Sequence, residues 1–256
     1  MTDADLIERR ERVFIVLAGT FLCAMTLLNV IGITRFVQLG PMALAVGVLP
    51  YPLTFLCTDL ISELYGRARA NFLVWTGLGL NFFILGTMWL AQALPAVAPE
   101  AQPPWQVLAL DEAVTLPNGE VVVGSVEFFQ LLYYCTSGAV FASMLAYIAA
   151  QFCDVQLFHF WRRLTRGKHL WLRNNFSTLA SQMVDSVMVI TVTFGAAYLA
   201  GDVATKTLLV LIGSNYLFKM IVALADTGPF YLLTHWLRRY LRIPDASSEY
   251  AMKAAA

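Results

Sequence analysis

Charged residues are scarce in this chain. Only 13% of its 256 residues are Asp, Glu, Lys or Arg, whereas an ordinary soluble domain has about a quarter. Hydrophobic residues make up 59% of the sequence, and 17 basic residues balance 17 acidic ones. The composition therefore indicates an integral membrane protein, and the zero net charge leaves no basic surface that would favour nucleic acid as a partner.

Motifs that would indicate an enzyme are also missing. The sequence has no P-loop, no glycine-rich nucleotide fingerprint and no GxSxG elbow, and its three histidines form no HxxxH or HExxH pair. The four cysteines form no CxxC pair and lie in or beside apolar runs, so we interpret them as small buried hydrophobic residues. We therefore expect no enzymatic activity, no cofactor and no metal site.

Long apolar runs are what the sequence does contain. A helix of about 20 residues crosses the hydrocarbon core of a bilayer. Runs of that length lie near residues 13–32, 37–60, 70–94, 128–152, 176–200 and 207–236. They predict an all-α integral membrane protein with six transmembrane helices. The second run contains Gly40-Pro41, Gly47 and Pro50-Tyr51-Pro52, and the sixth contains Gly228-Pro229, so both helices should be kinked or interrupted.

Basic residues lie mostly on one side of these spans. They precede the first helix, join the second to the third and the fourth to the fifth, and follow the sixth, whereas the opposite loops hold only Arg35 and Lys206. The positive-inside rule therefore predicts cytoplasmic termini. We expect one transmembrane domain over residues 1–242 and a cytoplasmic tail over 243–256. Three helices on each side of a long loop would also suit a 3+3 inverted repeat, a common transporter plan.

The loop over residues 95–127 has no Lys or Arg and should lie outside the membrane. Two β-prone arms flank Pro117-Asn118-Gly119 within it, and Asn-Gly is a strong hairpin turn signal. We predict a short external β-hairpin here, with a disordered spacer as the alternative.

Polar residues continue into the predicted fifth helix, in the stretch 170-LWLRNNFSTLASQMVD-185. Two series spaced by three or four positions lie on one face of this helix: Asn174, Thr178, Ser181 and Asp185, and Asn175, Thr178, Gln182 and Asp185. Interhelical hydrogen bonding explains the serine and threonine well. A carboxylate near the bilayer centre costs about 2.5 to 3.5 kcal/mol, so Asp185 favours a polar cavity instead.

Lys219 lies at a similar depth in the predicted sixth helix, with Asn215 one turn before it and Asp226 two turns after it. An ion pair between Asp185 and Lys219 would offset most of the cost of burying either charge. Two interpretations stay open. The pair could be structural and hold the fifth and sixth helices together, or it could be a gate or a proton-sensitive switch.

Two carboxylates, Asp59 and Glu63, lie one turn apart near the cytoplasmic end of the predicted second helix. Pairing with Arg67 at i+4 is enough to explain Glu63, whereas the deeper Asp59 favours a functional interpretation. Single polar residues such as Asn81 and Thr136, in the third and fourth predicted helices, are interpreted as interhelical hydrogen-bonding groups.

Two stretches resemble motifs of a known family. YPLTFLCTDLISELYGRARA (51–70) and GKHLWLRNNFSTLASQMVDS (167–186) are similar to signatures of the queuosine precursor transporter family, also called the vitamin-uptake-transporter-like family. The resemblance covers roughly residues 13–236. Tyr51 stands where phenylalanine is usual. The family's motif residues here are Asp59, Glu63, Tyr65, Arg173, Asn174, Asn175, Ser177, Thr178, Ser181, Gln182 and Asp185.

The resemblance implies a bacterial inner-membrane importer for 7-deazaguanine intermediates of the tRNA base queuosine, preQ0 or preQ1. Its partners would be a small purine-like substrate and membrane lipid. We expect a midplane site framed by the second, fifth and sixth helices. Its substrate-binding residues would be Asp59, Glu63, Asn174, Asn175, Thr178, Ser181, Gln182, Asp185 and Lys219.

The chemistry of the polar stripe accommodates such a ligand. A guanine-like edge presents an N–H and an amino group, which a carboxylate such as Asp185 can accept as two parallel hydrogen bonds. Amides such as Asn175 and Gln182 can donate to the carbonyl oxygen of the ligand. Two alternatives to an autonomous transporter stay open: a substrate-binding subunit that requires a separate ATPase, and an intramembrane enzyme. Glycines such as Gly77 and Gly79 would allow a homodimer, though small residues serve internal packing just as often.

Overall fold

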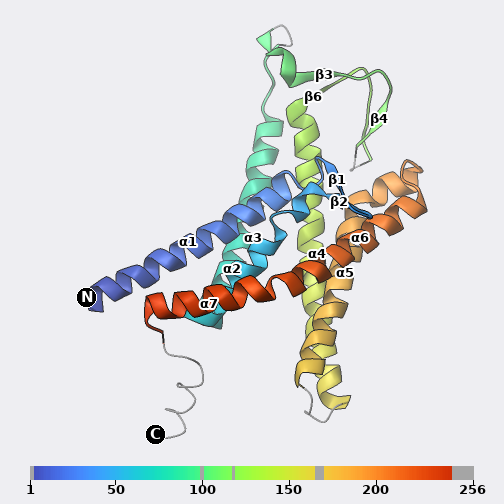
Figure 1. Cartoon of the computed structure of the whole chain (residues 1–256). Helices are drawn as coiled ribbons and strands as arrows, with labels where there is room; N and C mark the ends of the chain where they lie inside the picture. The colour runs from blue at the N-terminus through green and yellow to red at the C-terminus, as the bar shows by residue number, and fades with distance from the viewer. Residues whose placement is uncertain (1–2, 99–100, 117–118, 165–169, 244–256) are drawn as a thin grey trace, which may run out of the picture. The chain divides into compact units, whose positions relative to one another are not determined.

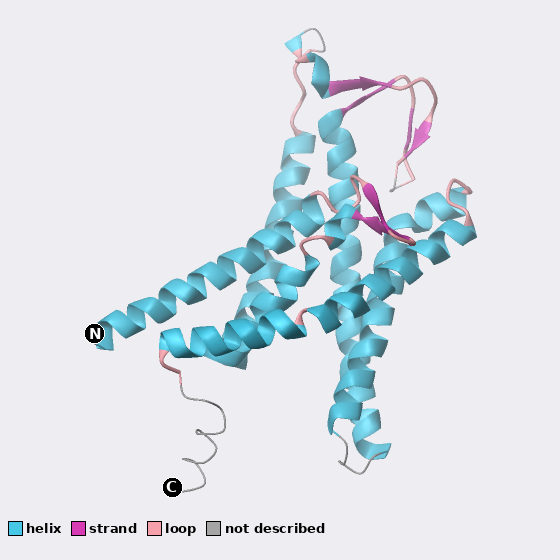
Figure 2. Cartoon of the chain, in the orientation of Figure 1, coloured by secondary structure: helices cyan, strands magenta, loops and turns pink. Residues whose placement is uncertain are grey.

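The computed structural model describes residues 3–98, 101–116, 119–164 and 170–243. These residues form seven α-helices, shown in Figures 1 and 2: α1 (Asp3–Val30), α2 (Tyr51–Tyr65), α3 (Arg67–Ala93), α4 (Phe128–Leu164), α5 (Leu170–Ala200), α6 (Thr205–Ala225) and α7 (Thr227–Leu241). Only Asp226 separates α6 from α7, so counting them together gives six helical segments. The predicted kink or interruption of the sixth span is confirmed, but it lies at Asp226, and Gly228-Pro229 belong to the first turn of α7.

Five helical stretches of the described chain are long and apolar enough to cross a membrane: Asp3–Val30, Ala68–Ala93, Phe128–Tyr147, Leu179–Ala200 and Thr205–Leu241. They lie within or around five of the six predicted runs. The chain is therefore a multi-pass membrane protein. The cytoplasmic placement of both termini and the inverted repeat stay predictions.

The second predicted span, near residues 37–60, is wrong as a continuous helix. Strands β1 (Phe36–Leu39) and β2 (Met42–Ala45) form an antiparallel hairpin there, and the 3-10 turn η1 (Val46–Val48) follows. Gly40 has a φ of 58° at the first of the two turn positions, as a type II′ hairpin turn requires. Pro52 lies in the first turn of α2, where a missing N–H has little cost. The predicted interruption is confirmed, and the helical part is only 15 residues long.

The predicted hairpin between α3 and α4 is confirmed and consists of two paired pieces. After the 3-10 turn η3 (Pro104–Gln106), β3 (Val107–Ala109) pairs with β6 (Ser125–Glu127), and β4 (Val114–Thr115) pairs with β5 (Val121–Val122). Near the tip, the N–H of Gly119 donates to the carbonyl of Leu116 at 2.8 Å. Pro117 and Asn118 lie outside the described residues, and the external position of the hairpin stays a prediction.

The chain divides into two compact units. Unit 1 contains Met1–Thr26, Pro50–Gly79 and Val222–Ala256, and unit 2 contains Leu27–Leu49 and Leu80–Ile221. The single domain over residues 1–242 stays a prediction. Of the predicted tail over 243–256, all but Ile243 lies outside the described residues.

Unit 1 has an apolar core, because α2 presents two buried stripes whose members are one turn apart. Cys57 and Ile61 pack in one cluster of buried residues with Phe21, Ala70 and Leu73, which come from α1 and α3. Leu60 and Leu64 pack in a second cluster with Leu237 and Leu241 of α7. Every fully buried side chain that the structure describes in unit 1 is apolar.

Unit 2 has a polar interior instead. Within it, α4 packs along α5 (Figure 1). All nine polar or charged residues that are buried in the described part of the chain belong to this unit: Asn29, Asn81, Thr136, Ser181, Ser186, Thr193, Ser214, Asn215 and Lys219. In a membrane protein, polar groups inside the bundle are costly and mark either interhelical hydrogen bonds or a functional cavity. Unit 2 is therefore where we place the candidate site.

Candidate functional site

The turn between α5 and α6 brings two charged residues to the same depth. Asp185 lies 15 residues before Ala200, where α5 ends, and Lys219 lies 14 residues after Thr205, where α6 begins. At 1.5 Å per residue, each is about 21 to 23 Å from the turn. The turn itself is tight because Gly201 has a φ of 89°, a left-handed conformation that commonly ends helices.

Lys219 and Asp185 form the predicted ion pair. The ammonium group of Lys219 donates to Oδ2 of Asp185, and the two side chains are 6% and 20% exposed. Removing one partner of such a pair leaves the other charge buried and unpaired, which costs about 3 to 5 kcal/mol. The pairing predicted from the sequence is therefore confirmed, and the carboxylate keeps an exposed edge.

The polar stripe on α5 extends further than the sequence prediction. Ser181 is buried and Gln182 is half-buried on the turn before Asp185. Two buried residues continue the stripe beyond Asp185. Ser186 lies four positions after Gln182, and Thr193 lies seven positions after Ser186, so both are on nearly the same face of α5. Their hydroxyl groups have no hydrogen-bond partner among the described residues. Neither residue was among the predicted site residues, although this spacing could have identified them.

The side chains of Asn174, Asn175 and Thr178, which begin the stripe, lie outside the described residues. Their role as site residues stays a prediction.

The β1–β2 hairpin lies against both helices that carry the ion pair. The N–H of Ala43 donates to Oγ of Ser214 on α6 at 3.3 Å, and the rings of Phe36 and Phe194 on α5 have centroids 5.9 Å apart. Ser214 lies nine residues into α6, about 14 Å from its start. Non-helical backbone at such depth is tolerated where protein covers it or where it lines a water-filled cavity. The hairpin therefore borders the polar interior of unit 2.

Two further polar contacts connect helices of unit 2. Asn29 of α1 donates through Nδ2 to Oδ1 of Asn81 on α3 at 3.1 Å, and the hydroxyl of Thr136 on α4 donates to the carbonyl of Val30 at 3.3 Å. The interpretation of Asn81 and Thr136 as interhelical hydrogen-bonding residues is confirmed. Oδ1 of Asn29 accepts no hydrogen bond from any described residue, so this oxygen can still accept one beside the contact.

The predicted site residues on α2 belong to unit 1. Glu63 accepts from the guanidinium of Arg238 on α7, which gives it a structural ion pair. The side chain of Arg67 lies outside the described residues, so the predicted i+4 pairing stays untested. Asp59 is exposed on α2, and Oδ2 of Asp226 is buried without a hydrogen-bond partner among the described residues. A site that α2 shares with α5 and α6 stays a prediction.

Comparisons with known proteins match the part of the chain that contains these candidate site residues. A family model described as "Putative vitamin uptake transporter" matches residues 45–233. A protein of Bacillus subtilis (strain 168) named "Probable queuosine precursor transporter" is 28% identical over 197 residues, which cover 75% of this chain and 72% of that protein. No solved structure matches this chain. The matched family region contains Asp59, Asp185 and Lys219.

Proposed function

Because the chain belongs to the transporter family described as "Putative vitamin uptake transporter", we propose that it imports the queuosine precursors preQ0 or preQ1 across the bacterial inner membrane. The name of the relative and the two motifs, in residues 51–70 and 167–186, support this substrate class. The observation that carries the proposal is the Asp185–Lys219 pair in a unit with a polar interior, in which Lys219 is buried and Asp185 is partly exposed. Such a pair supplies charge at mid-depth, where a polar base crossing the bilayer needs hydrogen-bonding partners.

In this proposal Asp185 holds the guanine-like edge of the substrate. A carboxylate has about four acceptor positions, so it can accept two parallel hydrogen bonds from the ring N–H and the exocyclic amine without releasing Lys219. The amide of Gln182, one turn earlier on α5, donates to the carbonyl oxygen of the ligand. The aminomethyl cation of preQ1 would add an ionic contact with a second carboxylate.

The path to the site follows α5 in both directions. Ser181 and Gln182 lie on the turn that precedes Asp185, and Ser186 and Thr193 lie beyond it, up to about 12 Å further along the helix. Polar groups on both sides of a central site are what alternating access requires. The hydroxyl groups of Ser186 and Thr193, which have no hydrogen-bond partner among the described residues, can hydrogen-bond to water or to the substrate as it passes.

The remaining predicted site residues are proposed on the family motifs alone. They are Asn174, Asn175 and Thr178 on α5, and Asp59 and Glu63 on α2. For Glu63, the ion pair with Arg238 offers a structural explanation as well.

Uptake of labelled preQ0 and preQ1 tests the proposal, in bacterial cells that lack their own importer. We expect uptake above the vector control with the wild-type chain. Asp185→Asn should lower uptake about 10- to 100-fold, because a hydrogen bond to a charged group contributes about 1.5 to 3 kcal/mol. Asp202→Asn is the matched control, since Asp202 is an exposed carboxylate in the turn after α5 and its loss should change uptake less than about twofold.

Two outcomes would contradict this proposal. Wild-type uptake at the level of the vector control removes the substrate assignment, and unchanged uptake by Asp185→Asn removes Asp185 from the site. The same measurement in proteoliposomes that contain only this chain addresses autonomy. Uptake that appears only after an ATPase subunit is added would favour the alternative of a substrate-binding subunit.

A further inference from the structure

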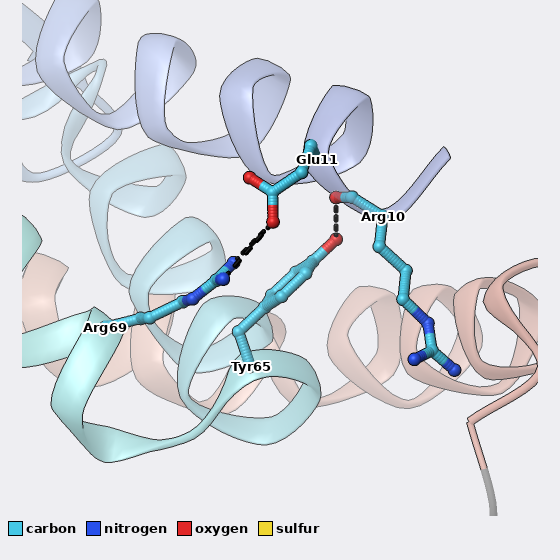
Figure 3. A network of polar contacts seen from close by, with 4 residues as sticks. All are labelled: Arg10, Glu11, Tyr65 and Arg69. Atoms are coloured by element: carbon cyan, nitrogen blue, oxygen red, sulfur yellow. Dashed lines mark hydrogen bonds and ion pairs between the residues drawn. The ribbon is translucent and has the colours of Figure 1, made fainter. Parts of the chain in front are cut away.

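The charged ends of several helices meet at one end of unit 1 (Figure 3). Arg69 of α3 donates to Glu11 of α1 at 3.1 and 3.2 Å, and the hydroxyl of Tyr65 on α2 donates to the backbone carbonyl of Arg10 at 2.8 Å. The guanidinium of Arg10 donates in turn to the carbonyl of Leu241, at the end of α7, at 3.1 and 3.2 Å. These contacts hold four helices together at this end.

The positive charges at this end are only partly neutralised. Three ion pairs join an arginine to a glutamate here: Arg12 with Glu8, Arg69 with Glu11, and Arg238 with Glu63. Arg9, Arg239 and Arg242 form no ion pair with any residue that the structure describes. Arg239 and Arg242 are also exposed to the surroundings of the protein. Three guanidinium groups are therefore available to an external anion.

An aromatic surface adjoins these arginines. Trp236 and Tyr240, one turn apart on α7, are stacked with centroids 5.7 Å apart and an interplanar angle of 7°. The guanidinium of Arg9 lies over the Tyr240 ring, 5.3 Å from its centroid. The two rings are 59% and 42% exposed, and Leu232, one turn before Trp236, is 71% exposed. The outward face of α7 is thus apolar, and arginine side chains lie at its C-terminal end.

We propose that this end of unit 1 binds the headgroup of an anionic phospholipid. The phosphate would be held by Arg9, Arg239 and Arg242, since guanidinium groups match phosphate oxygens in two parallel hydrogen bonds. The acyl chains would lie along Leu232 and Trp236, where tryptophan at a membrane interface has its apolar face in lipid. A free phosphate ion gains nothing from that apolar face, so the chemistry of the surface favours a lipid.

Titration of the purified full-length chain with phosphatidylglycerol or phosphatidylcholine in mixed micelles tests this site, with lipid binding read by native mass spectrometry. We expect phosphatidylglycerol to bind at least about tenfold more tightly, from the attraction of several arginines to an anionic headgroup. The triple variant Arg9→Gln, Arg239→Gln, Arg242→Gln should remove this preference. Arg12→Gln is the matched control: it removes the same charge from a neighbouring position whose arginine is paired with Glu8, and should change binding less than about twofold.

A charge-preserving variant separates loss of binding from loss of folding. Replacing the same three arginines by lysine should retain the preference for phosphatidylglycerol, within about threefold in affinity. The single variant Arg239→Gln, at an exposed position, should lower the affinity about three- to fivefold. Equal binding of the two lipids by the wild type, an unchanged glutamine variant, or equally tight binding of inorganic phosphate would each overturn the proposal.

Discussion

The buried polar side chains of unit 2 are of two kinds: those with a hydrogen-bond partner and those without one among the described residues. Thr136 has a partner in the carbonyl of Val30, whereas the hydroxyl groups of Ser186 and Thr193 have none among the described residues. A buried hydroxyl without a partner costs about 1 to 3 kcal/mol, so Ser186 and Thr193 do not stabilise the fold as it stands. We infer that these two hydroxyl groups contact water or the substrate.

Thr193→Val tests that explanation, because valine has nearly the shape of threonine and carries a methyl group in place of the hydroxyl. We expect the thermal unfolding temperature of the purified protein to stay the same or rise, since no hydrogen bond is lost. Uptake of the deazaguanine should fall. Thr136→Val is the matched control and should lower the free energy of unfolding by about 1 kcal/mol. A Thr193→Val variant that unfolds earlier than Thr136→Val would contradict the assignment.

At the residue scale, the sequence was most informative where charge was involved. Asp185 and Lys219 are costly in a bilayer, and their similar depths predicted the pair that the structure contains. Ser186, Thr193 and Ser214 carry a much smaller insertion cost, so hydropathy did not distinguish them from ordinary small residues. Only the helical spacing of Ser186 and Thr193 after Gln182 marked those two in the sequence. Asn29 lies close to the end of α1, where a polar residue looks like a helix boundary.

At the scale of elements, hydropathy predicted the helices well but not the β1–β2 hairpin. Residues 36–50 are apolar enough to extend the second span, and hydropathy alone cannot distinguish a buried hairpin from a helix. The Gly40-Pro41 turn between two four-residue arms was the available signal, and it predicted a kink or an interruption of a helix rather than a hairpin. The hairpin is held by protein contacts: Phe36 packs on Phe194 of α5, the N–H of Ala43 donates to Ser214 of α6, and the side chain of Leu44 is buried.

Close backbone packing fixes the base of this hairpin. A Cβ atom added to Gly47 would lie 2.7 Å from Cα of Gly32 and 2.7 Å from the carbonyl oxygen of Leu28, and neither backbone atom can move freely. We expect Gly47→Ala to lower the free energy of unfolding by about 1 to 3 kcal/mol, measured by thermal or denaturant unfolding in detergent. Gly138→Ala on α4 is the control, because a Cβ there meets nothing within 4 Å. It should be neutral or slightly stabilising, and equal destabilisation by both changes would contradict this packing argument.

At the scale of the whole molecule, the two units differ in what they bury. The buried side chains described in unit 1 are apolar, and its charged end supplies the proposed lipid site, whereas unit 2 holds the buried polar residues and the ion pair. Hydropathy could not predict this division, because a core that faces protein and a surface that faces lipid have similar compositions in a membrane protein. The family motifs on α2 and α5 fall in different units, so a role for both in one transport cycle stays a prediction.

Exchange of the two charges tests most directly whether Asp185 binds substrate or only supports the fold. Asp185→Asn alone leaves Lys219 buried without its carboxylate and should destabilise the protein by about 3 to 5 kcal/mol. The double variant Asp185→Lys, Lys219→Asp restores an ion pair and should recover most of that loss.

The decisive measurement is the equilibrium binding of preQ1 and preQ0 to the purified double variant, compared with the wild type at matched thermal stability. We predict that the recovered protein binds the deazaguanine at least about tenfold more weakly, because its carboxylate now projects from α6. Binding at wild-type affinity by a charge-exchanged protein of recovered stability would contradict the account and leave the pair a purely structural contact.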